Sequence, residues 1–239
     1  MYNAGALAFS DNMRPIHNSG LFSRALLYAK NFNGLIISFP YEEKISPNGL
    51  INEGVVSTKL GLEGIPDLSE ELMVNRDLLI NKYHEGRLHF NILSSKKSLE
   101  HIEVAKKTQN NLSCGTSIFH LLFDDEIINQ FDNRFKILPP FRTKEDRNAL
   151  LEGVKNGTID VITSYHQPNE KETTNVEFSL SPFGSIGTQV CFPLALTYLK
   201  EYIGLEKIVQ CMSINPRTIL QHEVPIIREG YGANMTLFN

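Results

Sequence analysis

The sequence predicts an α/β fold in which helices cover a parallel sheet. Two observations carry this prediction. Short apolar runs alternate five times with longer amphipathic stretches along the 239 residues, and parallel strands need a helical crossover of this kind between them. The composition, 41% hydrophobic and 21% charged, is that of an ordinary globular protein. The length allows one large domain or two small ones.

Five runs are expected to form the strands of this sheet. Each is a run of β-favourable or small apolar residues next to polar turn residues. The expected strands occupy residues 5–10, 35–39, 87–93, 112–116 and 159–163. Alternate side chains of each strand should face opposite sides of the sheet.

Five amphipathic stretches are expected to form the helices, at residues 20–31, 69–83, 98–108, 144–156 and 192–202. In the second, Ser69 can cap the helix, acidic residues follow in the first turn, and apolar residues recur at helical spacing. We interpret its Met and Leu residues as core rather than as a cofactor site. Gly86 and Gly157 directly follow two of these helices, where a left-handed residue commonly ends a helix.

The last sixteen residues change from helical to strand-and-turn chemistry. Residues 224–239 are expected to form two short strands around Gly230 and Gly232. These strands would belong to a separate β element beside the main layer.

Composition excludes several classes of function. The net charge of −4 and the sequence pI near 6.0 give no field that would attract nucleic acid or anionic lipid. No stretch approaches the roughly 18 apolar residues of a membrane span, and the first residues lack a signal-peptide pattern. A cytoplasmic protein is therefore expected. Three widely spaced cysteines without a Cys-x-x-Cys pair indicate neither a disulfide framework nor a thiolate zinc site.

Several segments, in order and spacing, resemble the dihydroorotase family of cyclic amidohydrolases. No single segment is decisive, but their collinearity is specific. They are Ala-Phe-Ser-Asp at 8–11, Gly-Leu-Ile-Asn-Glu-Gly at 49–54, Pro-Pro-Phe-Arg at 139–142, Ser-Tyr-His-Gln-Pro-Asn at 164–169, Phe-Gly-Ser-Ile-Gly at 183–187, Ile-Asn-Pro-Arg at 214–217 and Ala-Asn-Met-Thr-Leu-Phe at 233–238.

The resemblance implies a particular architecture. It implies a partial (β/α)8 barrel of the TIM type over residues 1–222, made of strand-helix units four to eight. Residues 223–239 would then begin a β-sandwich appendage. Active sites in such barrels lie at the carboxyl ends of the strands.

The resemblance also implies where zinc ligands would stand. Four positions can be tested, and they fall on Asp11, Phe39, Ile92 and Tyr165. Of these four positions, only Asp11 carries a carboxylate, and it is interpreted as a remnant of the family's zinc site. Phe39 and Ile92 offer no donor atom, and Tyr165 replaces the Asp that acts as general base in the family. A phenol with a pKa near ~10 is protonated at neutral pH and cannot take over that proton transfer. We therefore expect no cofactor and assign no catalytic residue.

Remnants of the family's substrate pocket are expected at Leu138, Arg142, His120, His166 and Asn169. Arg142 could contact an anion, although an ion-paired helix entry beside Glu145 and Asp146 is the preferred interpretation. A metal site rebuilt on His120 and His166 is an alternative, but we favour the absence of a metal site.

Other polar residues near the strands are given structural roles. His89 lies three positions before Ile92, so it is expected to face the helices as a structural histidine. Gly184 and Gly187 are interpreted as turn geometry rather than a phosphate cradle.

Three functions remain open. Intact relatives cyclise carbamoyl aspartate to dihydroorotate in pyrimidine biosynthesis, and this chain is expected to be a dihydroorotase-like protein without that activity. The alternatives are a non-catalytic assembly partner of aspartate carbamoyltransferase, or a truncated fragment of a longer dihydroorotase-like protein. Its first and last strands would be open edges. The isolated chain is therefore expected to form a homo-oligomer, to aggregate, or to require an upstream segment or partner that supplies the missing strands.

Overall fold

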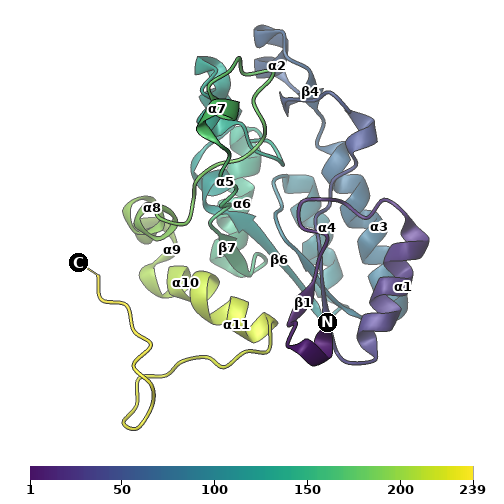
Figure 1. Cartoon of the computed structure of the whole chain (residues 1–239), viewed down its shortest axis with the longest axis vertical. Coiled ribbons are helices and arrows are strands. Elements are labelled where there is room, and N and C mark those ends of the chain that lie inside the picture. The colour runs from purple at the N-terminus through teal and green to yellow at the C-terminus, as the bar shows by residue number, and fades with distance from the viewer. Residues whose placement is uncertain (239) are drawn as a thin grey trace.

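A five-stranded parallel sheet forms the centre of the protein (Figure 1). The computed structural model describes residues 1–238. The strands are adjacent in chain order, with every pair parallel, which confirms the predicted α/β class. In sheet order they are β1 (Ala8–Phe9), β2 (Leu35–Ser38), β5 (Arg87–Phe90), β6 (Leu112–Ser117) and β7 (Val161–Thr163).

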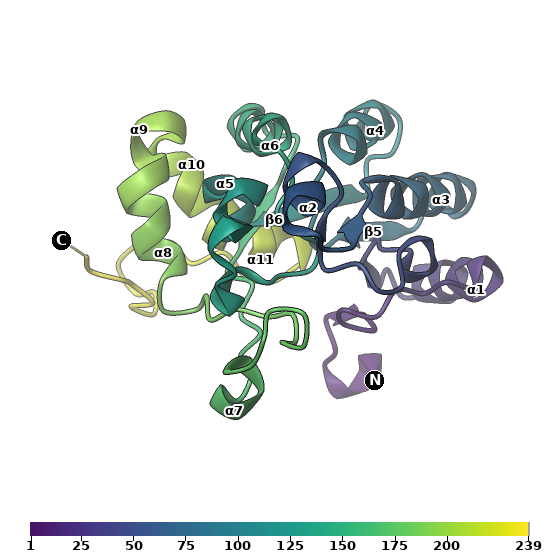
Figure 2. The same cartoon turned by 90° about the horizontal axis from the view of Figure 1, so that it is seen from above.

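Helices between the strands form an arc along one side of the sheet (Figure 2). Each lies within two residues of its predicted start, and α6 has the predicted bounds. The helices are α1 (Ser19–Lys30), α3 (Leu68–His84), α4 (Lys96–Lys106) and α6 (Lys144–Asn156). A short helix, α5 (Ile118–Leu122), follows β6 directly.

Smaller elements complete the fold. Between β2 and α3 the chain forms a two-stranded parallel sheet of β3 (Ile51–Asn52) and β4 (Gly64–Ile65), joined by α2 (Val55–Leu60). Helix α7 (Lys171–Thr174) lies in the long segment after β7. Short 3₁₀ helices occupy Tyr2–Ala4, Glu43–Ile45, Asp125–Gln130 and Asn133–Phe135.

The C-terminal helices form two longer bodies interrupted by wide π turns. The first comprises α8 (Cys191–Leu194), a π turn at Ala195–Leu199 and α9 (Lys200–Ile203), where one helix over 192–202 was predicted. The second comprises α10 (Leu205–Val209), a π turn at Gln210–Ile214 and α11 (Asn215–Ile219). Asn215 Nδ2 donates to the Asp160 carbonyl at 2.8 Å, which fixes this second body against the start of β7.

The two faces of the sheet can be told apart by one hydrogen bond. Ser38 Oγ donates to Asp77 Oδ2 of α3 at 2.6 Å, so Ser38 and its register partner Phe90 face the helices. Side chains alternate along a strand. His89 therefore lies on the opposite face, beside Ser113, whose Oγ is 2.8 Å from His89 Nδ1.

The prediction that His89 faces the helices is therefore wrong. The count of three residues back from Ile92 assumed an unbroken strand, whereas β5 ends at Phe90 and the chain bends at Asn91. His89 is nevertheless a structural histidine, because it is buried and bonded to Ser113.

Two predicted helix ends also differ. Helix α3 begins at Leu68 with Asp67 as its N-cap, so Ser69 lies inside the helix, buried, with no partner for its Oγ. Its left-handed terminator is Glu85, at φ 55°, rather than Gly86. Gly157 does end α6 in the predicted left-handed conformation, at φ 88°.

The C-terminal tail does not form the predicted strands. Residues 223–238 contain a turn near Gly230 and no strand. A strand requires a neighbour to satisfy its backbone groups, and the described part of this tail pairs with none. Apolar side chains such as Ile227 and Leu237 stay exposed, and the tail extends away from the body in Figure 1.

Within residues 1–238, the structure contains no helix with the length and apolar character that crossing a membrane requires.

Candidate functional site

The four predicted ligand positions all lie just past the carboxyl ends of strands. Phe39 directly follows β2, Ile92 follows β5 by two residues, and Tyr165 follows β7 by two. All three side chains are at most 4% exposed. Asp11, two residues past β1, is instead exposed to solvent.

Tyr165 is bonded to the backbone of one residue. Its Oη accepts from the amide nitrogen of Leu138 at 2.8 Å and donates to the carbonyl oxygen of Leu138 at 3.0 Å. Burial raises the pKa of this phenol, so the protonated form that the bond to the Leu138 carbonyl needs is favoured. Tyr165 itself adopts a left-handed backbone conformation, φ 49°, which is unusual for an aromatic residue.

Phe39 belongs to a small apolar cluster separate from the main core. Its buried members are Phe39, Tyr41 and Ile65, with the Phe39 and Tyr41 ring centroids 6.1 Å apart. Leu138 and Phe183 pack on this cluster. Because Leu138 is also held by Tyr165, it links the Phe39 cluster to the end of β7.

Ile92 and Tyr165 belong to the main core instead. The Tyr165 ring makes an edge contact with Phe119 at the start of α5, with centroids 6.5 Å apart. Three of the four positions, all except Asp11, thus belong to two packed apolar groups joined through Leu138.

The residues at these positions do not fit a zinc centre. Zinc needs three or four nitrogen, oxygen or sulfur ligands converging on one point. Of the four positions, only Asp11 and the Tyr165 phenol carry a donor atom, and the phenol is committed to Leu138. Within the described residues, no group of three or more His, Cys, Asp or Glu side chains is arranged to hold a metal.

The two histidines predicted near the site have separate roles. His120 is buried between Ser117 Oγ, 2.7 Å from its Nδ1, and the Pro139 carbonyl, 3.0 Å from its Nε2. Burial lowers the pKa of His120 to about 4, so it is neutral at neutral pH. His166 is exposed, and its Nδ1 accepts from the amides of Gly187 and Thr188, each at 3.4 Å. Both imidazoles are therefore engaged in structural bonds.

Arg142 does not form the predicted ion-paired helix entry. Its guanidinium is buried and donates to Ser94 Oγ at 3.1 Å, Asn52 Oδ1 at 2.9 Å and the Ile65 carbonyl at 2.6 Å. The predicted partners bond elsewhere. Glu145 pairs with Lys96 at 2.7 Å, and Asp146 accepts from Thr143 at the helix N terminus.

The negative partner of Arg142 is a residue that sequence reasoning missed. Glu70, fully buried in the first turn of α3, accepts hydrogen bonds from the amides of Ser94 and Ser95 at 3.0–3.1 Å and from both hydroxyls. Ser94 Oγ thus connects the Glu70 carboxylate to the Arg142 guanidinium. Nothing in the local sequence distinguishes Glu70 from its neighbour Glu71, an ordinary first-turn acid.

Lys136 is a second missed residue. Its buried ammonium group donates to the carbonyls of Phe178, Ser179 and Ser181 at 2.6–3.2 Å, and it lies 5.2 Å from the ring centroids of Phe178 and Phe183. Within residues 1–238 no carboxylate bonds this group, and burial lowers its pKa. Lys136 therefore holds the segment that follows α7 through carbonyl and ring contacts alone.

The glycine-containing loop after α7 packs against the end of β7. Asn169 Nδ2 donates to the Phe183 carbonyl at 3.1 Å. A Cβ at Gly184 or Gly187 would overlap the backbone of the 164–167 segment, so both positions require the close approach that only glycine allows. Close packing against this backbone, rather than the predicted turn geometry, therefore accounts for both glycines.

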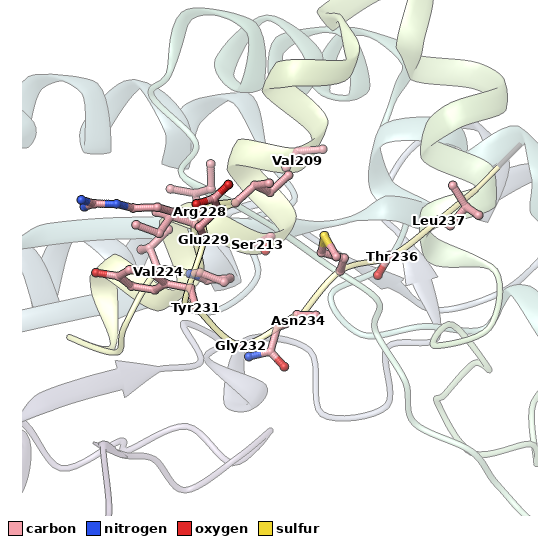
Figure 3. Close-up of a pocket in the computed structure, with 16 residues that line it drawn as sticks. Val209, Ser213, Val224, Arg228, Glu229, Tyr231, Gly232, Asn234, Thr236 and Leu237 are labelled. Carbon is pink, nitrogen blue, oxygen red and sulfur yellow. The ribbon is translucent and has the colours of Figure 1, made fainter.

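One cavity lies beside this loop and another lies at the C-terminal tail. A polar cavity of about 470 Å³ lies beside the loop, lined by residues that include Asn133, Gln167 and Asn169. A larger one, about 890 Å³, lies between the second C-terminal helical body and residues 224–237, away from the four ligand positions (Figure 3).

Sequence comparison identifies relatives over nearly the whole chain. The chain is 36% identical over 236 residues to a dihydroorotase of Acetivibrio thermocellus, covering 98% of this chain and 55% of that protein. It is 38% identical over 237 residues to a dihydroorotase of Syntrophus aciditrophicus, covering 99% and 56%. The chain thus spans about half the length of the curated relatives that it matches. No protein-family model matches it.

Solved structures share the fold. The L-hydantoinase (dihydropyrimidinase) of Arthrobacter aurescens superimposes with a TM-score of 0.79 at 20% identity, covering 92% of this chain and 52% of that one. A dihydroorotase of Saccharomyces cerevisiae, in complex with 5-fluoroorotic acid, gives a TM-score of 0.70 at 12% identity, covering 86% and 55%.

The fold is thus an α/β fold with a parallel sheet, similar to the TIM-barrel structures of the amidohydrolase superfamily. Within that class, the predicted resemblance is confirmed: the chain is dihydroorotase-like, related in sequence to curated dihydroorotases along nearly its whole length.

Proposed function

We propose that this chain is a dihydroorotase-like protein without dihydroorotase activity. The observation that carries the proposal is the commitment of Tyr165, at the position of the family's general base, to the backbone of Leu138. A group that donates one hydrogen bond and accepts another to hold a chain segment is not free to move a substrate proton. The apolar side chains of Phe39 and Ile92 add no metal ligand.

The test is a cyclisation assay of the 239-residue chain with carbamoyl aspartate and added zinc, together with metal analysis of the purified protein. The Syntrophus aciditrophicus dihydroorotase, assayed in parallel, is the positive control. We expect less than stoichiometric zinc and no turnover above the buffer blank. Tight zinc binding or measurable turnover would refute the proposal.

A variant series makes the test sharper. Restoring the three residues together, Phe39→His, Ile92→His and Tyr165→Asp, is expected to leave the chain inactive, because the family's first-strand pair lies outside this sequence. Activity in that triple variant would show that the remaining ligands are misplaced in the alignment.

The five strands are further proposed to correspond to units four to eight of the family's barrel. Their parallel order and the coverage of about half of each relative support this correspondence. The same coverage also supports a fragment of a longer dihydroorotase-like protein, which is the alternative to a dihydroorotase-like protein that is inactive in its own right. Transcript mapping of the native gene separates the two, because a fragment requires coding sequence continuous with this one.

An assembly role with aspartate carbamoyltransferase is a second proposal, supported by the family resemblance. Sedimentation of the chain mixed with the carbamoyltransferase from the same genome is the direct test. A co-sedimenting complex would support the role, and independent sedimentation at micromolar concentrations would refute it.

A further inference from the structure

An apolar cavity adjoins the polar cavity that lies beside the loop after α7. It has a volume of about 340 Å³, and its lining includes four phenylalanines, Phe119, Phe123, Phe135 and Phe141. We call it the aromatic cavity. Helices α5 and α8 border the aromatic cavity, and α7 borders the polar one (Figure 1). The linings of the two cavities share three residues, Arg134, Ser185 and Ile186, which we call the ridge.

The ridge lies at the molecular surface. Ile186 is 59% exposed, and the Arg134 side chain is 84% exposed. Ser185 Oγ donates to the Arg134 carbonyl at 3.2 Å, which joins the two segments that form the ridge. A ligand can therefore lie across the ridge, with one end in each cavity, without passing through the protein interior.

The aromatic cavity has room for one apolar group. The Phe123 ring lies edge-on to Phe135 and Phe141, with centroids 5.2 and 5.9 Å apart, so the rings support one another. Apolar cavities of about 150 Å³ hold benzene. In the described lining of the aromatic cavity, the one charged side chain is that of Arg134 at the ridge. A phenyl or branched alkyl group is therefore the kind of group that this cavity favours.

The polar cavity carries one charge of each sign. Arg134 donates from Nε and Nη2 to the Asp132 carboxylate at 2.6–3.0 Å, and these hydrogen bonds lower the pKa of Asp132. Both groups are therefore ionised at neutral pH. Among residues 1–238, Arg134 Nη1, Asn169 Oδ1 and the Gln167 side-chain amide have no hydrogen-bond partner. These groups remain available to a ligand.

The available groups match a zwitterion better than a single charge. A ligand carboxylate can accept from Arg134 Nη1, and a ligand ammonium can donate to Asn169 Oδ1 or to Asp132. Because Asp132 and Arg134 stand side by side, a ligand with one charge would meet a like charge next to the opposite one. A ligand that carries both charges pairs with each.

We propose that the two cavities form one binding site for an apolar α-amino acid. The charged head lies in the polar cavity, with its carboxylate at Arg134, and the side chain crosses the ridge to lie among the phenylalanine rings. None of the four zinc-ligand positions lines either cavity, so the site is separate from them. The proposal does not rest on the proposed lack of activity.

The first test is a titration of the 239-residue chain with L-phenylalanine, followed by amide chemical shifts in NMR spectra. Because the head stays in contact with water, a dissociation constant on the order of 1 mM is expected. Saturable shifts are expected at the amides of Arg134, Ser185 and Ile186. No saturable shift up to the solubility limit of L-phenylalanine would overturn the proposal.

Three analogues test the two parts of the ligand. Hydrocinnamate lacks the ammonium, phenethylamine lacks the carboxylate, and L-alanine lacks the ring. Each is expected to bind about tenfold more weakly than L-phenylalanine. Equal affinity for hydrocinnamate or phenethylamine would overturn recognition of a zwitterion, and equal affinity for L-alanine would overturn the role of the aromatic cavity.

Two variants locate the site. Arg134→Gln should weaken L-phenylalanine binding about tenfold, whereas Arg24→Gln, on an exposed arginine of α1, is the control and should not change it. Val190→Trp fills the aromatic cavity from its exposed edge and should abolish binding, with the exposed Val104→Trp of α4 as control.

Thermal melts verify that each variant folds. Should Val190→Trp not fold, Arg134→Gln still decides the matter, because its side chain is at the surface. Binding that neither variant weakens would place the amino acid elsewhere and overturn the proposal.

Discussion

The hydroxyl of Tyr165 bonds both the amide nitrogen and the carbonyl oxygen of Leu138. The two residues are 27 positions apart, and the pair joins the end of β7 to the segment that leads into α6. One side chain thereby satisfies two backbone groups for which the described residues supply no other hydrogen-bond partner. Tyr165 is thus a structural cross-connection at the carboxyl end of β7.

Removing that hydroxyl should destabilise the fold. Tyr165→Phe keeps the ring but leaves two backbone groups of Leu138 without a partner, which costs about 1–3 kcal/mol. Urea unfolding measures the change. Tyr198→Phe, on an exposed ring, is the control and should change stability little. Equal stability of the Tyr165 variant and the parent would mean that water replaces the hydroxyl.

Phe39→Ala should cost roughly 3–5 kcal/mol, because the ring is buried among Tyr41 and Ile65 and its loss leaves a cavity. Leu180→Ala, at an exposed position, serves as the matched control. Thermal and urea unfolding provide the measurement. A loss near zero would indicate an open, solvent-filled pocket at the end of β2.

The buried charges of Arg142 and Glu70 should be energetically coupled through Ser94. Arg142→Met alone leaves the Glu70 carboxylate without its cation, at an expected cost of about 3–5 kcal/mol. The double variant with Glu70→Gln should cost less than the sum of the single changes, with a coupling of about 0.5–3 kcal/mol. A double-mutant cycle in urea gives this number. Additive effects would contradict a connected network.

Stability should fall in mild acid because of two neutral histidines. Burial lowers the pKa values of His89 and His120 to about 4, from 6.5 in the unfolded chain. The unfolded state therefore binds more protons between pH 6.5 and pH 4, so stability rises with pH across this window and is flat above it. Each histidine contributes roughly 3 kcal/mol to the change.

Urea unfolding between pH 4.5 and 7.5 tests this dependence. His120→Gln should remove about half of the pH dependence, since His89 remains to supply the other half. The exposed His222→Gln is the control and should leave the slope unchanged. A pH-independent parent protein would show that neither imidazole is held neutral.

Sequence reasoning succeeded where local patterning decides structure. The bounds of α6 follow from its Thr143 cap and its left-handed Gly157, both readable from neighbouring residues. The orientation of the His89 side chain was predicted wrongly because a bend at Asn91 breaks the alternation of side chains along the strand. Arg142 was misassigned because its partners lie 48 to 90 positions away, whereas the candidate partners considered lay within four residues.

The contacts of Lys136 affect how residues 133–136 and 174–181 unfold locally. Its ammonium, with Asn133 Nδ2 bonded to the carbonyls of Thr174 and Val176, ties residues 133–136 to five carbonyls between 174 and 181. Two segments that are distant in the chain should therefore come loose together rather than one at a time. In hydrogen exchange, their amides should share a single opening free energy and a common dependence on denaturant.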